Sequence, residues 1–339
     1  MVARADDWRE RGGYFSWRPA QEDASPVEIF HVEIGDPGAP VLLLIHGWPT
    51  SSIDWFEVAG PLSARFRVCA LDFPGYGFSD KPPGWGYSLT RDEELIEFYA
   101  LEVIGAEAGV VVAHDRGDSV ALLHVVRCAE GRSAMRLDHL VLSNGNIFLP
   151  LSNLTQAQRL ILDAESWPQV AATLTPSLLA EGMGAATFTP PRKAGDPEVE
   201  ALTAIFAHHD GIKVLHEGIQ YLVERSKDEQ TWLTALAEAP FPVTLIWGLY
   251  DTVSPPRVAS YVWNEYLMRR PGGNRLYFIP DANHYLQVDR PDAFVKVLLH
   301  ALEPAGDQAP GALAAELGAP LLVDSSRERL PSAADLLRL

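Results

Sequence analysis

The 339-residue sequence has few cysteines, a deficit of basic residues and no long apolar run. Its two cysteines, Cys69 and Cys128, are too few for a disulfide scaffold or a cysteine-based zinc site. The core must therefore hold the fold, and we expect a reducing, cytoplasmic setting. Lysine plus arginine number 27 against 45 aspartate plus glutamate, which gives a formal net charge of −18. This acidity argues against nucleic-acid and anionic-membrane partners, because phosphate contacts need a basic surface.

The longest purely aliphatic run, 41–45, is far shorter than the roughly 20 residues that span a bilayer. Residues 1–17 are polar and charged where a secretory signal needs an apolar stretch. We therefore expect neither a membrane segment nor export. With 47% apolar side chains, a chain of this length can form one large domain with a sizeable core.

Short apolar runs alternate with longer amphipathic stretches, which is typical of parallel strands joined by helices. Apolar residues at three- and four-residue spacing predict helices over 90–105, 118–130 and 291–303. The fold class is therefore α/β. The predicted strands are 28–34, 41–45, 67–71, 109–113, 139–143, 243–247 and 275–279.

The interval between Ser143 and Val243 is much longer than a normal strand-to-strand connection. Its helical pattern predicts an inserted cap over 147–238, with the core formed by 14–146 and 239–302. Residues 303–339 are rich in proline, glycine and alanine, and we expect this tail to be loosely ordered.

The strand 109–113 leads directly into His114-Asp115-Arg116-Gly117 and then a helix. Asp115 thus has a small residue two positions away on each side, Ala113 and Gly117, at a strand-to-helix turn. This pattern has the form of a nucleophile elbow with aspartate in place of serine. Asp115 is the predicted nucleophile, although a helix-capping carboxylate would also suit this place. In a second register, residues 117–121 would make Ser119 an esterase nucleophile, at the cost of burying polar residues in the strand.

Such a nucleophile needs donors for the oxyanion that forms when its ester is hydrolysed. The strand 41–45 ends in His46-Gly47-Trp48-Pro49, the position from which this type of fold supplies one backbone N–H. The other N–H belongs to the residue after the nucleophile. The predicted oxyanion hole is therefore the backbone N–H groups of Trp48 and Arg116.

The expected chain order in such a fold is nucleophile, acid, histidine. Asp251 follows the strand 243–247 and His284 follows the strand 275–279, so both reach the same edge of the sheet. The segment 143–146, Ser-Asn-Gly-Asn, offers no competing carboxylate. Other histidines lie in strands, helices or adjoining turns and are expected to be structural: His31, His46, His114, His124, His139 and His300.

These motifs together resemble the epoxide hydrolase and haloalkane dehalogenase branch of the α/β-hydrolase fold over roughly residues 14–302. Residues 46–55, 114–121 and 142–148 look most similar to the epoxide-hydrolase-like group of the mesoderm-specific transcript protein. The resemblance implies a mostly parallel eight-stranded sheet with a helical cap, a small-molecule substrate, and no metal or cofactor. It implies a covalent aspartyl ester that a water activated by His284 hydrolyses, while Asp251 orients the imidazole. A homodimer is left open.

Leaving-group chemistry separates the members of this branch. Epoxide opening creates an alkoxide and needs an acid, which family members supply from cap tyrosines. Residues 151–219 contain no tyrosine, and Tyr221 takes the place of the second cap tyrosine. Cap histidines at 208, 209 and 216 are alternative donors.

Three alternatives to an epoxide hydrolase remain. The same triad could serve a haloalkane or haloacid dehalogenase. Arg116 resembles the fluoroacetate dehalogenase pattern, but Ser119 replaces the second arginine of that pattern. A silent binding scaffold would not need the whole triad, and esterase chemistry is the last option. We expect His46, Trp48 and Arg116 to contact the substrate.

Overall fold

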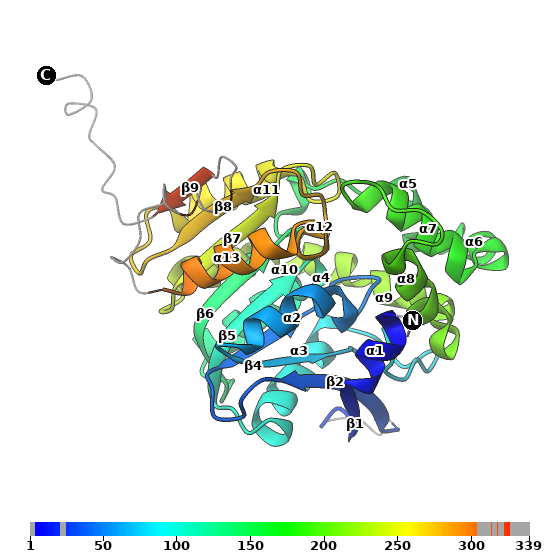
Figure 1. Ribbon diagram of the computed structural model, residues 1–339, viewed down its shortest axis with the longest axis horizontal. Coiled ribbons are helices and arrows are strands. Elements are labelled where there is room, and N and C mark those ends of the chain that lie inside the picture. Colours follow the sequence, from blue (N-terminus) through cyan, green and yellow to red (C-terminus); the bar gives the residue numbers. More distant parts are fainter. Residues whose placement is uncertain (1–3, 21–24, 304–312, 314–316, 318–321, 326–339) are drawn as a thin grey trace, which may run out of the picture.

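The computed structural model describes residues 4–20, 25–303, 313, 317 and 322–325. Its centre is one sheet with helices on both faces (Figure 1). In the described part, the strands follow the order β1-β2-β4-β3-β5-β6-β7-β8-β9. They are β1 (Gly12–Trp17), β2 (Val27–Ile34), β3 (Val41–Ile45), β4 (Arg67–Leu71), β5 (Ala108–His114), β6 (Arg136–Ser143), β7 (Val243–Gly248), β8 (Arg275–Ile279) and β9 (Leu322–Ser325).

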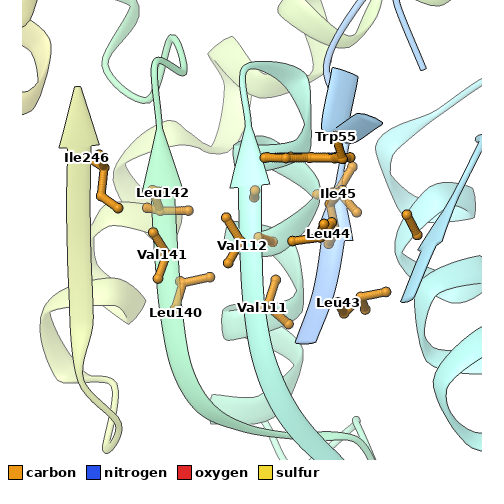
Figure 2. Packing of buried hydrophobic residues seen from close by; sticks show 14 of the residues in the cluster. Leu43, Leu44, Ile45, Trp55, Val111, Val112, Leu140, Val141, Leu142 and Ile246 are labelled. Carbon is orange, nitrogen blue, oxygen red and sulfur yellow. The ribbon is translucent and has the colours of Figure 1, made fainter. Parts of the chain in front are cut away.

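The strands from β4 to β8 pair in parallel, whereas β1, β2 and β9 join antiparallel at the edges. Helices cover both faces of a parallel sheet, so its central strands carry consecutive buried aliphatic residues. Figure 2 shows this core around β3, β5, β6 and β7, with Leu43, Val112, Leu142 and Ile246 among its members. The carboxyl ends of these strands meet at one edge, where the polar loops gather.

The α/β fold and the seven predicted strands are confirmed, with ends that shift by at most a few residues. The expected eight-stranded sheet is present as β1 to β8. A ninth strand, β9, comes from the tail that we expected to be loosely ordered, and it pairs with β8 from Phe278↔Leu322 to Arg275↔Ser325. The backbone of β8 would otherwise be an open edge of the sheet. The other predicted tail residues, except 303, 313 and 317, lie outside the described part.

Helices flank the sheet on both sides. The predicted helix 90–105 is α3, which continues into the π-helical turn η2. The core helices are α2 (Phe56–Ser63), α3 (Leu89–Phe98), η2 (Tyr99–Val103), α4 (Arg116–Ala129), α11 (Pro256–Val262), η5 (Trp263–Leu267), α12 (Leu286–Asp289) and α13 (Pro291–Leu302), with the short η1 (Ser52–Trp55) before α2.

The helical insertion lies beyond the carboxyl ends of the strands (Figure 1). The N-terminal helix α1 (Arg4–Glu10) packs on α8 of this insertion, and α10 packs along α4. The helices of the insertion are η3 (Leu149–Leu151), α5 (Gln156–Leu162), α6 (Trp167–Thr173), α7 (Pro176–Thr187), α8 (Pro197–Ala207), η4 (His208–Val214), α9 (Leu215–Ile219) and α10 (Tyr221–Glu238). None of the described helices has the length and apolar character that crossing a membrane requires.

Candidate active site

Asp115 lies at a sharp turn between β5 and α4, at the carboxyl edge of the sheet. Its φ of 51° and ψ of −115° lie outside the regions that most side chains adopt, so the turn is strained. Two glycines make room for the turn. A Cβ on Gly47 would lie 2.6 Å from the Cβ of Asp115, and one on Gly117 would lie 2.7 Å from the carbonyl oxygen of Ile45. The residues thus form the predicted elbow.

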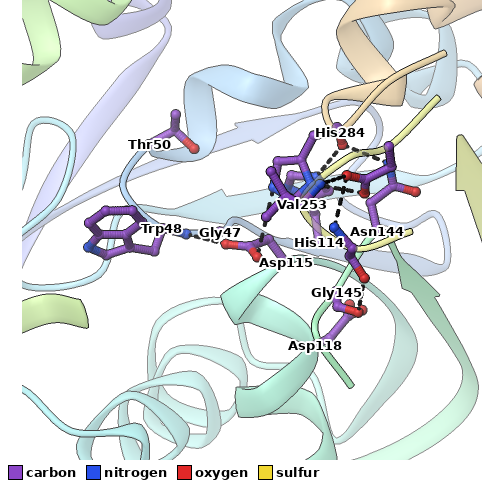
Figure 3. Close-up of polar contacts among 12 residues, drawn as sticks. Gly47, Trp48, Thr50, His114, Asp115, Asp118, Asn144, Gly145, Val253 and His284 are labelled. Atoms are coloured by element: carbon purple, nitrogen blue, oxygen red, sulfur yellow. Dashed lines mark hydrogen bonds and ion pairs between the residues drawn. The ribbon is translucent and has the colours of Figure 1, made fainter. Parts of the chain in front are cut away.

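The two carboxylate oxygens of Asp115 have different surroundings (Figure 3). The Trp48 backbone N–H donates to Oδ2 at 3.0 Å, and the Arg116 backbone N–H also binds this carboxylate. Oδ1 is buried, has no hydrogen-bond partner within the described residues and lies 3.8 Å from Nε2 of His284. Burial raises the pKa of Asp115, while His284 and the two N–H groups oppose that rise. One oxygen is thus held and the other is free to react.

His284 lies between two carboxylates. Its Nδ1 is 3.0 Å from Oδ2 of Asp251, and the other Asp251 oxygen accepts the backbone N–H groups of Val253 and Ser254 at 2.8 and 2.9 Å. Burial lowers the pKa of His284, but Asp251, followed by Asp115, outweighs burial and raises the pKa to about 9. Asp251 therefore orients the ring so that Nε2 faces Asp115.

The loop that carries His284 is fixed by residues that the sequence did not single out for this role. The Asn144 amide donates to the carbonyl oxygens of Asn283 and His284 at 2.8 and 2.9 Å, and its Oδ1 accepts the N–H of Gly248. His114 Nε2 also lies 2.8 Å from the His284 carbonyl oxygen. Asn144 thus joins the loops after β6, β7 and β8. Its place in the Ser-Asn-Gly-Asn segment, directly after a predicted strand, was the available signal.

A cavity of about 70 Å³ lies between core and insertion next to this triad. Its walls include Trp48, Val253, His284 and Tyr285 from the core, and Ile161, Leu179 and Met183 from α5 and α7. The walls are mainly apolar. The Trp48 indole N–H is buried and has no hydrogen-bond partner in the described part of the chain.

Tyr221 and Arg116 lie close together beneath the insertion. Tyr221 begins α10 and is buried, and its ring centre is 5.6 Å from the guanidinium of Arg116. Burial, followed by Asp115, raises the pKa of Tyr221 well above its ordinary value, so the phenol keeps its proton. The Arg116 side chain pairs with Asp92 and also lies over the ring of Tyr76. Neither Tyr221 nor the Arg116 guanidinium is among the residues that line the 70 Å³ cavity.

His46, expected to contact the substrate, instead contacts backbone. Its Nδ1 lies 2.8 Å from the Gly47 carbonyl oxygen, and its Nε2 accepts the N–H of Phe73. Burial lowers its pKa to about 3, so the ring is neutral. The cavity does not include His46 in its lining, because both ring nitrogens are held by the two loops that the ring connects.

The three cap histidines considered as proton donors have other contacts. His208 bonds the carbonyl oxygen of Phe78 and stacks on His209, which pairs with Asp80. His216 bonds the carbonyl oxygen of Ile161. None of the three lines the described cavity.

Ser119 lies within α4 rather than at the elbow. Its hydroxyl accepts a 2.5 Å hydrogen bond from the guanidinium of Arg225, a buried residue of α10. The serine-nucleophile register therefore does not match the turn, whose strained residue is Asp115.

Comparison with known families agrees with this geometry. Residues 40–291 match the family model of the alpha/beta hydrolase fold. The chain belongs to this family. It is 32% identical over 296 residues to the putative hydrolase LipZ of Mycobacterium tuberculosis, covering 87% of this chain and 97% of that protein.

Two other relatives lie in the branch that the motifs indicated. The mesoderm-specific transcript protein of Mus musculus is 29% identical over 299 residues, which covers 86% of each chain. Haloalkane dehalogenase 2 of Mycobacterium tuberculosis is 24% identical over 290 residues, or 82% of this chain and 92% of that one. The chain is thus similar in sequence to hydrolases of this fold, one of which is a haloalkane dehalogenase.

Proposed function

We propose that this protein is an epoxide hydrolase that forms a covalent ester on Asp115. The observation that carries the proposal is the asymmetry of the Asp115 carboxylate, since the Trp48 N–H holds Oδ2 while Oδ1 has no hydrogen-bond partner among the described residues and lies beside His284. Oδ1 attacks an epoxide carbon in line and the ring C–O bond breaks. No base is needed for this step.

The second half-reaction uses the same groups in other roles. A water beside His284 loses a proton to Nε2 and attacks the ester carbonyl carbon. The carbonyl oxygen lies in the N–H pair of Trp48 and Arg116, which stabilises its developing negative charge. Asp251 stabilises the imidazolium that forms.

The substrate suited to this site is small and apolar, because the cavity is small and its walls are mainly hydrocarbon. We take 147–238 as the cap that closes the site and supplies Tyr221 as an acid for ring opening. Tyr221 is buried near Asp115 and keeps its proton, which suits a donor to an alkoxide.

A dehalogenase is the second candidate, because the Trp48 indole N–H is buried in the cavity wall and has no partner among the residues that the structure describes. A halide leaving group needs only such a weak donor. The similarity to haloalkane dehalogenase 2 also favours this alternative.

Purified protein incubated with styrene oxide and with 1-bromobutane separates the candidates. Diol without bromide supports an epoxide hydrolase, whereas bromide without diol supports a dehalogenase. Asp115→Asn should abolish turnover of either substrate, because an amide is a far weaker nucleophile. Circular dichroism like that of the parent would show that the variant is folded, and unchanged activity in it would exclude the mechanism.

A further inference from the structure

Two buried side chains, Tyr285 and Thr50, connect the cavity to the carboxyl group of Asp54, which lies outside the triad. Thr50 Oγ1 donates to Oδ2 of Asp54 at 2.5 Å, and the Thr50 hydroxyl also interacts with Tyr285, where it opposes the rise in the pKa of that phenol. Tyr285 lines the cavity and packs edge-on against His284, with ring centres 5.0 Å apart. Thr50, Asp54 and Tyr285 therefore form a continuous polar path that ends next to the reacting groups. Figure 3 shows Thr50 near Trp48.

We propose that Tyr285 is a catalytic proton donor for epoxide opening, and that Thr50 and Asp54 form the relay that supplies its proton. This inference rests on the proposed epoxide hydrolase function. Family members have two cap tyrosines as donors, whereas the first tyrosine of this insertion is Tyr221. Tyr285 would supply the donor that is missing from the cap. Tyr285 reaches the cavity from the core loop after β8 instead of from the cap.

The surroundings of Asp54 suit an acid rather than a second nucleophile. Asp115 binds two backbone N–H groups, and Asp251 binds two together with the imidazole. The Asp54 carboxyl instead binds the hydroxyl of Thr50. Burial raises the pKa of Asp54 well above its ordinary value, helped by Asp72 and Asp115 and opposed by the Thr50 hydroxyl and His284, which favours the protonated carboxyl. The charged groups that face it are Asp72, Asp115 and His284, with Arg4 and Glu198 across a small cavity.

That second cavity gives Asp54 a route for proton uptake. It measures about 20 Å³, which is room for about one water molecule. Arg4 and Glu198 line it, and their side chains are each 15% exposed. Asp54 thus lies between the substrate cavity on one side and partly exposed charged residues on the other.

The proton balance closes over one turnover. As Oδ1 of Asp115 bonds to the epoxide carbon, the C–O electron pair moves to the ring oxygen, which takes the Tyr285 proton. Tyr285 takes the Thr50 proton and Thr50 takes the Asp54 proton, which leaves Asp54 ionised. Ester hydrolysis then releases the diol and leaves one proton on Asp115. Transfer of this proton from Asp115 to Asp54 returns both carboxyl groups to their starting states. The net reaction is therefore epoxide plus water to diol.

The test isolates alkylation in a His284→Gln background, where the ester cannot be hydrolysed efficiently and accumulates. Intact-protein mass spectrometry follows adduct formation with styrene oxide and, separately, with 1-bromobutane. Tyr285→Phe should slow the epoxide reaction about 10- to 100-fold and leave the bromide reaction within twofold. An unchanged bromide rate also shows that the variant is folded. Should 1-bromobutane form no adduct, circular dichroism and thermal unfolding replace it as the test of folding.

The relay is tested by a matched pair. Thr50→Val removes the hydroxyl and should slow epoxide opening like Tyr285→Phe, whereas Thr50→Ser keeps the hydroxyl and should restore most of the rate. In the His284→Gln background, we expect the rate of epoxide alkylation to decline at alkaline pH as Asp54 loses its proton. Asp54→Asn should remove this decline, and His284 cannot be its cause because that histidine is absent. Tyr277→Phe is the control, because this buried tyrosine bonds His300 away from the cavity.

The outcomes separate this inference from the proposed function. If the His284→Gln protein forms an epoxide adduct at the same rate with and without Tyr285→Phe, the relay is wrong and the epoxide hydrolase stands. The relay is also wrong if Thr50→Ser and Thr50→Val behave alike. If no epoxide adduct forms on Asp115 at all, the proposed function fails and the relay fails with it.

Discussion

At the residue scale, the proposed mechanism assigns Asp115 and His284 to two steps that experiments can separate. Asp115 attacks without a base, whereas ester hydrolysis requires His284 to deprotonate water. His284→Gln should therefore form the alkyl-enzyme at a rate similar to the parent and hydrolyse it at least about 100-fold more slowly. Mass spectrometry should show protein that gains the mass of the substrate. Unmodified protein at saturating substrate would contradict this assignment.

Asp251 acts on the reaction through the imidazole alone. Its carboxylate is fixed by the Val253 and Ser254 N–H groups and holds Nδ1 of His284 at 3.0 Å. Asp251→Asn should lower kcat by about 10³-fold, because the imidazolium loses its charged partner and the ring its preferred tautomer. The acid limb of kcat should also move to lower pH, because only the neutral imidazole accepts a proton from water and Asp251 raises the pKa of His284. A kcat within tenfold of the parent would place the acid elsewhere.

The sequence predicts the triad because strand-end loops of a parallel sheet meet at one edge. Asp115, Asp251 and His284 each follow an apolar run directly, and the structure places them together. It does not predict Asn144 as the bridge between three loops, or the contact of Thr50 with Tyr285. Those contacts join residues far apart in the chain, and hydrophobic patterns carry no information about which polar side chains meet.

At the element scale, the elbow depends on close packing of α4 against the end of β3. A Cβ on Gly117 would lie 2.7 and 2.8 Å from the carbonyl oxygens of Ile45 and His46, which are backbone atoms. Gly117→Ala should therefore lower the free energy of unfolding by about 1–3 kcal/mol. Activity should fall too, because the first turn of α4 carries the Arg116 N–H. Urea unfolding and single-turnover kinetics measure the two effects.

Gly60 in α2 provides the matched control, because a Cβ there meets no atom within 4 Å. Gly60→Ala should raise the free energy of unfolding by about 0.5–1 kcal/mol, since alanine favours the helix. Equal losses of stability in both variants would show that the contact at Gly117 relaxes without cost.

Hydrophobic periodicity predicts a strand or helix only where at least one face of that strand or helix is buried. Strands β3, β4 and β8 agree with the predicted ranges at both ends, because their buried runs have clear limits. The edge strand β1 was not predicted, since its residues are mostly half-buried or exposed. The ninth strand was missed because the surrounding proline, glycine and alanine resemble a linker.

At the scale of the whole molecule, core and insertion meet around one cavity and contribute different chemistry. In the proposed mechanism, the core supplies the nucleophile, the water-activating histidine and the oxyanion hole. The insertion supplies apolar walls and Tyr221. Several hydrogen bonds join the two parts, among them Glu224 with the Leu89 N–H and Arg225 with Ser119. In this proposal, the core determines the reaction type, and residues around the cavity determine which leaving group is accepted.

A substitution of Tyr221 tests whether the insertion helps to determine which leaving group the site accepts. An alkoxide is too basic to leave unassisted at neutral pH, so a buried phenol near Asp115 should donate as the epoxide opens. Tyr221→Phe keeps the ring against Arg116 and removes only the hydroxyl. It should slow alkylation by styrene oxide about 10- to 100-fold and leave any alkylation by 1-bromobutane unchanged.

The control for this variant is Tyr99→Phe, which removes the hydroxyl of another buried tyrosine, one that bonds His31 away from the cavity. Its alkylation rates should match those of the parent. Equal rates for Tyr221→Phe and the parent with both substrates would assign Tyr221 to packing. The core tyrosine Tyr285 would then be left as the single tyrosine donor proposed for ring opening. A combined loss in the double variant that exceeds either single loss would show that both tyrosines assist ring opening.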